Sequence, residues 1–273
     1  MPSPTRRPAA AQTTLQVIET IRLTPGLVRV VLGGTELTDF PDRPDTDKYA
    51  KLFFPPAGST LRPPYDLATL RDEVAFDELP TVRTYTIRRV DLDRGVMEID
   101  FVVHGDTGVA GPWAANAQPG DELTMSAPGG GFSPDPEADS ILLIGDESAI
   151  PAISAALESL RDDAHVTVLL ESRSAEHRAD LPDSPARVTW IDEDHDAPGA
   201  QLVDAVAALE WPAGRVQVFA HGERGAMKAL RPILIERGVD RSDLSLSAYW
   251  AAGRTEDAFQ AEKRLPVGQI FPA

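Results

Sequence analysis

The segment TVRTYTIRR, residues 81–89, carries a cation, an aromatic ring and hydroxyl groups on one short stretch. The side chain of Arg83 can pair with a phosphate, and the ring of Tyr85 can stack on a flat ligand. Thr84 and Thr86 add hydroxyl groups that can hydrogen-bond to ring heteroatoms. These residue types suit a large, planar, phosphorylated ligand. The alternative is an ordinary amphipathic strand with a half-buried Tyr85 and a solvated Arg83, because Tyr and Thr are common in strands.

A glycine-rich segment follows at residues 104–123, with the sequence HGDTGVAGPWAANAQPGDEL. Gly105, Gly108 and Gly111 leave backbone amides open to close approach by a ligand. We expect Trp113 to start a short helix, and a helix N-terminus preceded by glycines is a ready anion site. The alternative is a glycine-rich connection with Trp113 in the core. Its place after TVRTYT favours the ligand site.

Strand ends in the second half of the chain also carry side chains suited to a nucleotide. Asp146, Glu147 and Ser148 form the turn between a buried strand, ILLIG, and a helix, where open α/β sheets bind nucleotides. The turn lacks the GxGxxG pattern, its carboxylates would repel a pyrophosphate that faced them, and an ordinary turn capped by Ser148 is the alternative. Arg173 ends the next strand, where it can read a 2′-phosphate or lie solvated in a loop. His221 can belong to the same pocket or simply shape a turn.

Apolar and polar residues alternate with a period of two up to about residue 132, which predicts short strands. The segments are LQVIETIRL (15–23), LVRVVLGG (27–34), YAKLFF (49–54), RTYTIRRV (83–90), VMEIDFVVH (96–104) and DELTMSA (121–127). Six strands with almost no helical periodicity indicate a small antiparallel barrel. Residues 55–80 form a long insertion, for which we expect no regular structure beyond one helical turn.

Glycines and prolines crowd together near residues 128–139, and apolar strands then alternate with amphipathic helices. This alternation indicates a parallel sheet with both faces covered. The predicted fold class is therefore an antiparallel β-barrel followed by an α/β domain. The predicted organisation is a disordered lead-in at 1–14, a barrel at 15–132, a linker at 133–139 and an α/β domain with a C-terminal helix at 140–273.

The composition excludes several classes of function. The chain has 273 residues, a net charge of −17 and no cysteine, which rules out disulfides, thiolate-held iron–sulfur clusters and cysteine nucleophiles. The negative charge argues against nucleic acid as a partner, and the absence of a long apolar run argues against membrane insertion. The histidines show no zinc spacing and residues 191–199 read as a solvated acidic loop, so we expect no metal site. The N-terminus lacks the apolar core of a signal peptide, and we expect a cytoplasmic protein.

Four segments occur together and in order: RTYTIR, DFVVHG…GVAGPWAANAQPGDEL, LLIGDESAIPAI and YWAAGRTEDAFQAEKR. In this the chain resembles the siderophore-interacting protein family, within the ferredoxin-reductase-like superfamily, from about Leu15 to Arg264. The resemblance implies an FAD-binding barrel, a C-terminal NAD(P)H-binding domain and ferric-siderophore reductase activity. It also implies NADPH as the preferred donor, because the segment TEDAFQAEKR resembles the C-terminal helix of members that prefer NADPH. NADH and a ferredoxin are the alternative donors.

The predicted site residues come from the resemblance, taken position by position, and from the reasoning on strand ends given above. The cofactor-binding positions are Arg83, Thr84, Tyr85, Thr86, His104, Gly105, Ala110, Gly111, Pro112, Trp113, Ala114, Asp146, Glu147, Ser148, Arg173 and Trp250. A basic mouth for an anionic ferric siderophore is predicted at Lys51, which matches a basic position of the family, and at Arg254, Lys263 and Arg264, and the alternative for each is an ordinary solvated cation. Relatives often have an arginine just after the late Trp, where this chain has Ala251 and Ala252, so Arg254 is the nearest cation there.

The implied chemistry is electron transfer rather than acid–base catalysis. Hydride passes from the nicotinamide to the flavin, which delivers single electrons to Fe(III) chelates. The siderophore's hard oxygen donors bind Fe(II) less tightly than Fe(III), so reduction of the iron leads to its release. No side chain is predicted to act as a catalytic acid or base. Two alternatives are a flavin or electron-carrier reductase on the same scaffold, and a non-catalytic siderophore- or flavin-binding protein.

Overall fold

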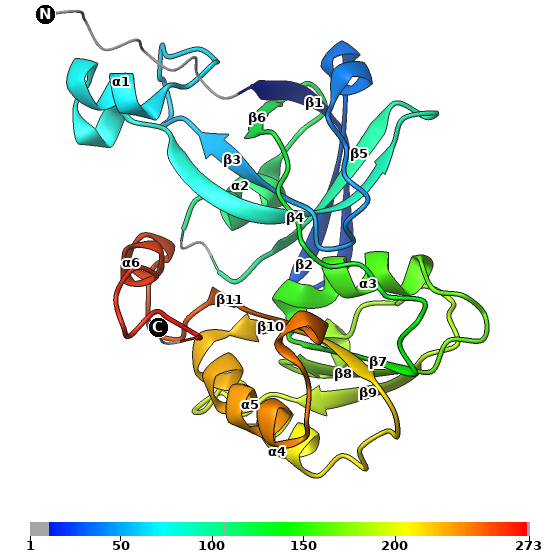
Figure 1. Cartoon of the computed structure of the whole chain (residues 1–273). Coiled ribbons are helices and arrows are strands. Elements are labelled where there is room, and N and C mark those ends of the chain that lie inside the picture. Colours follow the sequence, from blue (N-terminus) through cyan, green and yellow to red (C-terminus); the bar gives the residue numbers. More distant parts are fainter. Residues whose placement is uncertain (1–10, 106–107, 272–273) are drawn as a thin grey trace, which may run out of the picture.

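The computed structural model describes residues 11–105 and 108–271, so most of the predicted lead-in lies outside the described residues. Within these ranges six antiparallel strands close into a barrel in the order β1-β2-β5-β4-β3-β6 (Figure 1). The strands are β1 Gln12–Thr24, β2 Leu27–Gly33, β3 Tyr49–Phe54, β4 Thr81–Asp91, β5 Val96–Val102 and β6 Glu122–Ser126. All six predicted segments are strands, and β1 begins at Gln12 rather than at Leu15.

The alternation along β3 explains how the barrel gains its core. Ala50 and Leu52 are fully buried, whereas Tyr49 and Lys51 are exposed, because successive side chains of a strand point to opposite faces. Inward-facing side chains from all six strands meet in one apolar cluster. Lys51 therefore points away from the core, as the alternation predicts.

The helix α2, Ala110–Asn116, packs into this core through Ala114 and Trp113. The ring of Trp113 lies 5.7 Å from that of Phe101, centroid to centroid. The prediction that the helix starts at Trp113 is wrong. The N–H of Trp113 already bonds to the carbonyl of Val109 at 3.0 Å, so Trp113 closes the first turn rather than opening it.

The second domain is a five-stranded parallel sheet in the order β11-β10-β7-β8-β9 (Figure 1). Its strands are β7 Ser140–Gly145, β8 Val166–Ser172, β9 Arg187–Asp192, β10 Val216–Glu223 and β11 Leu244–Trp250. The predicted fold class, a β-barrel followed by an α/β domain, is confirmed. Because β6 ends at Ser126 and β7 begins at Ser140, the domain boundary falls between them, and its exact limits stay a prediction.

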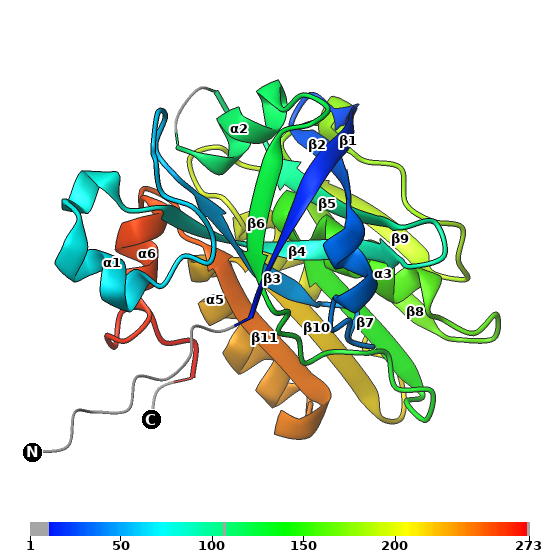
Figure 2. The same cartoon turned by 90° about the horizontal axis from the view of Figure 1, so that it is seen from above.

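Helices cover both faces of this sheet, as continuous apolar strands require. The helix α3 lies on the face toward the barrel, and α4 and α5 pack on the opposite face (Figure 1). A last helix, α6, lies at the side of the barrel (Figure 2), and α1 stands in the 55–80 insertion. The helices are α1 Leu67–Glu73, α3 Ile150–Glu158, α4 Ala200–Ala207, α5 Arg224–Glu236 and α6 Glu256–Glu262. In the part of the chain that the structure describes, no helix has the length and apolarity to cross a membrane.

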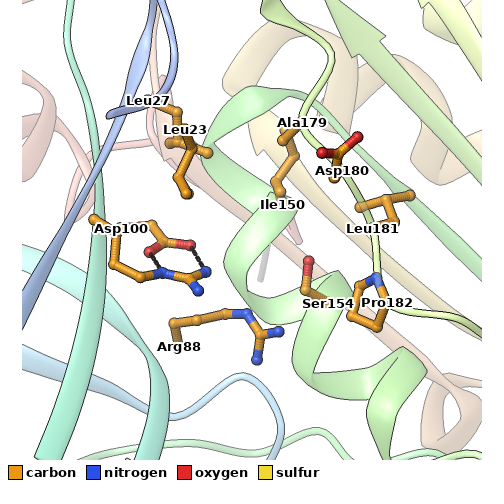
Figure 3. Close-up of a pocket in the computed structure, with 11 residues that line it drawn as sticks. Leu23, Leu27, Arg88, Asp100, Ile150, Ser154, Ala179, Asp180, Leu181 and Pro182 are labelled. Atoms are coloured by element: carbon orange, nitrogen blue, oxygen red, sulfur yellow. Dashed lines mark hydrogen bonds and ion pairs between the residues drawn. The ribbon is translucent and has the colours of Figure 1, made fainter. Parts of the chain in front are cut away.

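The barrel and the sheet meet through α3. Arg88 of β4 is 6% exposed and forms two hydrogen bonds with Glu158 at the end of α3, at 2.8 and 2.6 Å. Beside this pair lies a cavity of about 270 Å³, lined from the barrel by Arg88 and Asp100 and from α3 by Ile150 and Ser154 (Figure 3). Asp100 in this lining accepts hydrogen bonds from Arg29 at 2.7 and 2.9 Å. None of the predicted site residues lines this cavity.

Candidate functional site

The strand β4 divides the four predicted ligand residues between its two faces. Arg83 and Tyr85 pair with the inward-facing residues of β3, whereas Thr84 and Thr86 pair with its outward-facing residues. The Tyr85 ring lies 4.5 Å from that of Phe101 and packs against the barrel core, where burial raises its pKa. The hydroxyl groups and the aromatic ring therefore face opposite sides, and stacking of Tyr85 on a flavin stays a prediction.

The guanidinium of Arg83 already holds two oxygen atoms of one anionic group. Its Nη1 and Nη2 donate to the two carboxylate oxygens of Asp257, in α6, at 2.7 and 3.3 Å. The Arg83 side chain is 14% exposed, whereas that of Asp257 is 78% exposed. A planar fork of this kind also matches two oxygens of a phosphate, so the carboxylate occupies the position of the predicted pyrophosphate contact.

The outward face of β4 meets the carboxyl end of β11. The hydroxyl of Tyr249 lies near the side chain of Thr86, and burial raises the pKa of Tyr249. Tyr249 lies edge-on to the His221 ring at 4.9 Å, and His221 stacks on Phe219 at 3.9 Å. The nucleotide-type sheet therefore reaches the predicted flavin strand directly.

His221 is a neutral imidazole in this arrangement. Burial lowers its pKa to about 3, and its Nε2 lies 3.0 Å from the Ser245 hydroxyl. Its Nδ1 is buried and has no hydrogen-bond partner among the described residues. At physiological pH the ring therefore adds an aromatic surface and no positive charge.

The buried side chain of Asp146, just after β7, forms hydrogen bonds to the ends of β10 and β11. Its carboxylate accepts hydrogen bonds from the N–H of Ser148 (2.9 Å), the N–H of Glu223 (2.8 Å) and the indole Nε1 of Trp250 (2.8 Å). Burial raises its pKa, and these hydrogen bonds oppose that rise. The alternative of a turn capped by Ser148 is wrong, because Asp146 is the capping acceptor. Gly222 permits this packing, since a Cβ there would come within 2.5 Å of the Asp146 carboxylate.

Glu147 and Arg173 form a second internal pair at the same edge. Nε of Arg173 lies 3.0 Å and Nη2 lies 2.6 Å from Oε2 of Glu147, and the backbone N–H of Arg173 donates to Oε1 at 3.0 Å. The Arg173 side chain is 25% exposed. To bind a 2′-phosphate of NADPH, Arg173 would have to share its guanidinium with Glu147. Recognition of the 2′-phosphate by Arg173 therefore stays a prediction.

Two of the four predicted mouth cations, Lys51 and Lys263, interact through their charges. The ammonium of Lys263 lies 4.6 Å from the centroid of the Phe259 ring, and its pKa is lowered, first by desolvation and also by the positive charge of Lys51. Arg254 is held by Glu262 at 2.8 Å, and Arg264 is exposed just beyond α6. The charges of Lys51 and Lys263 therefore interact, with the carboxylate of Glu256 opposing the effect on Lys263, and Arg254 has a carboxylate partner.

The glycine-rich segment is open where it leaves β5. His104 and Gly105 are exposed, and Gly105 and Gly108 have φ values of 56° and 87°. A Cβ at either glycine would meet no atom within 4 Å, so a ligand can approach the backbone there. Part of the predicted flavin segment, residues 106–107, lies outside the described residues. The predicted contacts Ala110, Gly111, Pro112, Trp113 and Ala114 all lie within α2.

Sequence reasoning missed two carboxylates that organise this region. Asp257 holds Arg83 across 174 residues of sequence, and no local pattern indicates that contact. Glu223 caps α5 through the N–H of Ala226 at 2.9 Å and accepts the N–H of Ala252 at 3.1 Å. An acidic residue just before a predicted helix was the available signal for this cap.

Two protein-family models match this chain, and together they cover most of its residues. Residues 16–132 match the model of the siderophore-interacting FAD-binding domain, and residues 138–253 match that of the siderophore-interacting protein. The chain belongs to the siderophore-interacting protein family. The resemblance in sequence is thus confirmed, and FAD is the cofactor that the matched barrel domain binds.

Similar proteins extend over nearly the full length. The ferric vibriobactin reductase ViuB of Vibrio cholerae is 34% identical over 254 residues, covering 90% of this chain and 91% of ViuB. The NADPH-dependent ferric-chelate reductase of Escherichia coli is 32% identical, covering 87% of this chain and 92% of that protein. Both relatives are named as reductases, which agrees with the predicted class of enzyme, an oxidoreductase, and the second is named as NADPH-dependent.

Solved structures agree with the family. The siderophore-interacting protein SipS from Aeromonas hydrophila has a TM-score of 0.79 and 28% identity, covering 94% of this chain and 98% of SipS. A siderophore utilization protein from T. fusca has a TM-score of 0.76 and 34% identity, covering 90% and 95%. Phthalate dioxygenase reductase, at 15% identity and a TM-score of 0.63 over 90% of this chain and 70% of that one, shares the fold.

Proposed function

We propose that this protein reduces ferric siderophores, taking electrons from NADPH through FAD and releasing Fe(II). The observation that carries the proposal is the contact between Tyr249, at the carboxyl end of β11, and Thr86 on the predicted flavin strand. Open α/β sheets bind nucleotides at their carboxyl edge. In this protein the carboxyl edge of the sheet adjoins β4, the predicted flavin strand. A nicotinamide bound at that edge would therefore lie near the flavin, as hydride transfer requires.

The chain's residues fit FAD. The fork of Arg83 holds two carboxylate oxygens where it would hold two phosphate oxygens, and Gly105 leaves its backbone open. Thr84 and Thr86 offer hydroxyl groups on the face that adjoins β11. When bound, FAD would take a hydride from the nicotinamide and pass electrons singly to Fe(III). The protein's part is to hold the two nucleotides and to leave an opening for the chelate.

The opening for the chelate is assigned to Lys51 and Lys263. Lys51 lies on the outward face of β3. The pKa of Lys263 is lowered first by desolvation, is raised by the charge of Glu256 and is lowered further by the charge of Lys51, so the two ammonium groups repel each other. An anionic chelate between them would relieve this repulsion, and it would find an attractive site on a chain of net charge −17. Arg254 and Arg264, the other two predicted cations, flank α6, and Arg254 is paired with Glu262. The ferric siderophore is the substrate, and its iron leaves once reduction weakens the hold of hard oxygen ligands.

The decisive experiment is anaerobic stopped-flow spectroscopy of the FAD-loaded protein. We expect NADPH to bleach the flavin band, and an anionic ferric siderophore to restore it while Fe(II) is trapped by ferrozine. NADH and a reduced ferredoxin serve as alternative donors in parallel. Absence of flavin reduction by any donor would leave only a binding protein. Reoxidation by ferric siderophores no faster than by free flavin would indicate a general electron-carrier reductase.

A further inference from the structure

The first turn of α6 covers the predicted flavin strand. Asp257 binds the fork of Arg83 through both of its oxygens, at 2.7 and 3.3 Å. Its neighbour Glu256 is partly buried, and desolvation raises its pKa. Burial raises the pKa of Tyr85, and the charge of Glu256 adds to that rise. One acid of this helical turn thus binds the side chain assigned to the flavin's pyrophosphate, and its neighbour acts through its charge on the ring assigned to the flavin.

The remainder of α6 is anchored independently of this contact. Phe259 is 1% exposed and packs with Ala248 and Ala251, at the end of β11. Farther along, Glu262 accepts hydrogen bonds from Arg224 and Arg254. These contacts can keep the helix in place while its first turn, capped by Thr255, loosens.

We propose that Asp257 is a built-in competitor for the pyrophosphate of FAD, so that the cofactor must displace its carboxylate from Arg83. This proposal rests on the proposed function, because it assumes that Arg83 binds the cofactor's phosphates. The side chain of Arg83 is 14% exposed, which leaves little room for two anionic groups on one fork. A phosphate and a carboxylate that both stayed near this guanidinium would repel each other. The Asp257 carboxylate is 78% exposed, so it can turn into water when it is released.

Removing the competitor should strengthen cofactor binding. An exposed ion pair contributes up to about 1 kcal/mol, or about fivefold in affinity, and relief of repulsion adds to that. We therefore expect Asp257→Asn to lower the Kd for FAD about three- to tenfold. Riboflavin, which has no phosphate, should bind equally well to both proteins. Asp162→Asn, at an exposed acid on the α3–β8 connection, is the matched control for net charge and should bind FAD like the wild type.

The test measures quenching of flavin fluorescence on titration of the apoprotein, with hydrogen exchange of residues 255–262 as a second readout. We expect FAD to accelerate exchange at the Ala258 amide, which the Thr255 hydroxyl holds in this structure. An Asp257→Asn protein that binds FAD like the wild type, or more weakly, would overturn the proposal. An equal gain for riboflavin and FAD would overturn it as well.

The failure of this inference is distinguishable from failure of the proposed function. If the wild-type apoprotein binds no FAD, the assignment of the flavin site falls, and the competitor falls with it. If FAD binds, Arg83→Ala weakens it and Asp257→Asn changes nothing, only the competitor is refuted, and Asp257 is then a strut between α6 and the barrel.

Discussion

Replacement of Arg83 by alanine should weaken FAD binding without unfolding the barrel. A hydrogen bond to a charged group contributes about 1.5–3 kcal/mol, which is what a phosphate contact of Arg83 would supply. In the wild type, breaking the Arg83–Asp257 pair offsets up to about 1 kcal/mol of this gain, because the pair is partly exposed. The net loss in Arg83→Ala is therefore roughly 0.5–2 kcal/mol, or about two- to thirtyfold in Kd.

The assay is titration of the apoprotein with FAD at concentrations near its Kd, with thermal unfolding recorded for each variant. The unfolding temperature should change little, since Arg83→Ala leaves behind a carboxylate that is already 78% exposed. Arg83→Lys should fall between alanine and wild type, because lysine keeps the charge and loses the fork. Arg89→Ala is the matched control on the same strand, with a 47% exposed side chain paired to Asp91. Retention of wild-type affinity by Arg83→Ala would refute the assignment of the pyrophosphate contact.

Three further predictions concern the donor, the mouth and a buried acid. Arg173→Ala should raise KM for NADPH and leave that for NADH unchanged in steady-state assays, whereas equal effects would mean that Arg173 reads no 2′-phosphate. Lys51→Ala and Arg254→Ala should each lower kcat/KM for an anionic ferric siderophore, while the rate of flavin reduction by NADPH stays unchanged. Added salt should slow the reduction of the siderophore by the wild type, because the screening length falls to ~3 Å at 1 M. Variants that reduce the siderophore as fast as the wild type would refute the basic mouth. Burial raises the pKa of Glu171 from 4.5 to about 7, so the folded state holds that proton more tightly and stability falls as pH rises through this window, by up to about 3 kcal/mol. Glu171→Gln should flatten the decline in urea unfolding between pH 5 and 7, and an unchanged slope would assign it to other groups.

The fold was predictable because its signals are local. Each barrel strand carries its own period-two alternation, and Lys51 could be placed outward simply because Ala50 and Leu52 had to face inward. In the second domain, continuous apolar strands such as ILLIG and amphipathic helices each show their own pattern. These signals do not depend on which segments finally meet in space.

The site was less predictable because its contacts join distant parts of the chain. The indole of Trp250 meets Asp146 across 104 residues, and the N–H of Glu223 meets it across 77. Local reasoning offered Ser148 as the alternative cap of the turn, since a hydroxyl before a helix is a common cap. It could not foresee that the Asp146 carboxylate serves the turn and two neighbouring strands at once.

The acidic residues at the carboxyl edge of the sheet mainly bind donors within the protein. Asp146 and Glu223 accept backbone N–H groups, and Glu147 binds Arg173. A carboxylate whose oxygens are occupied by donors projects less negative potential than a free one, because the donor dipoles oppose its charge. The repulsion of a pyrophosphate expected from the sequence is therefore weakened at this edge. Asp257 differs, because it is exposed and bound to the one fork assigned to the cofactor's phosphates, and this makes it the acid whose removal should be felt most in FAD binding.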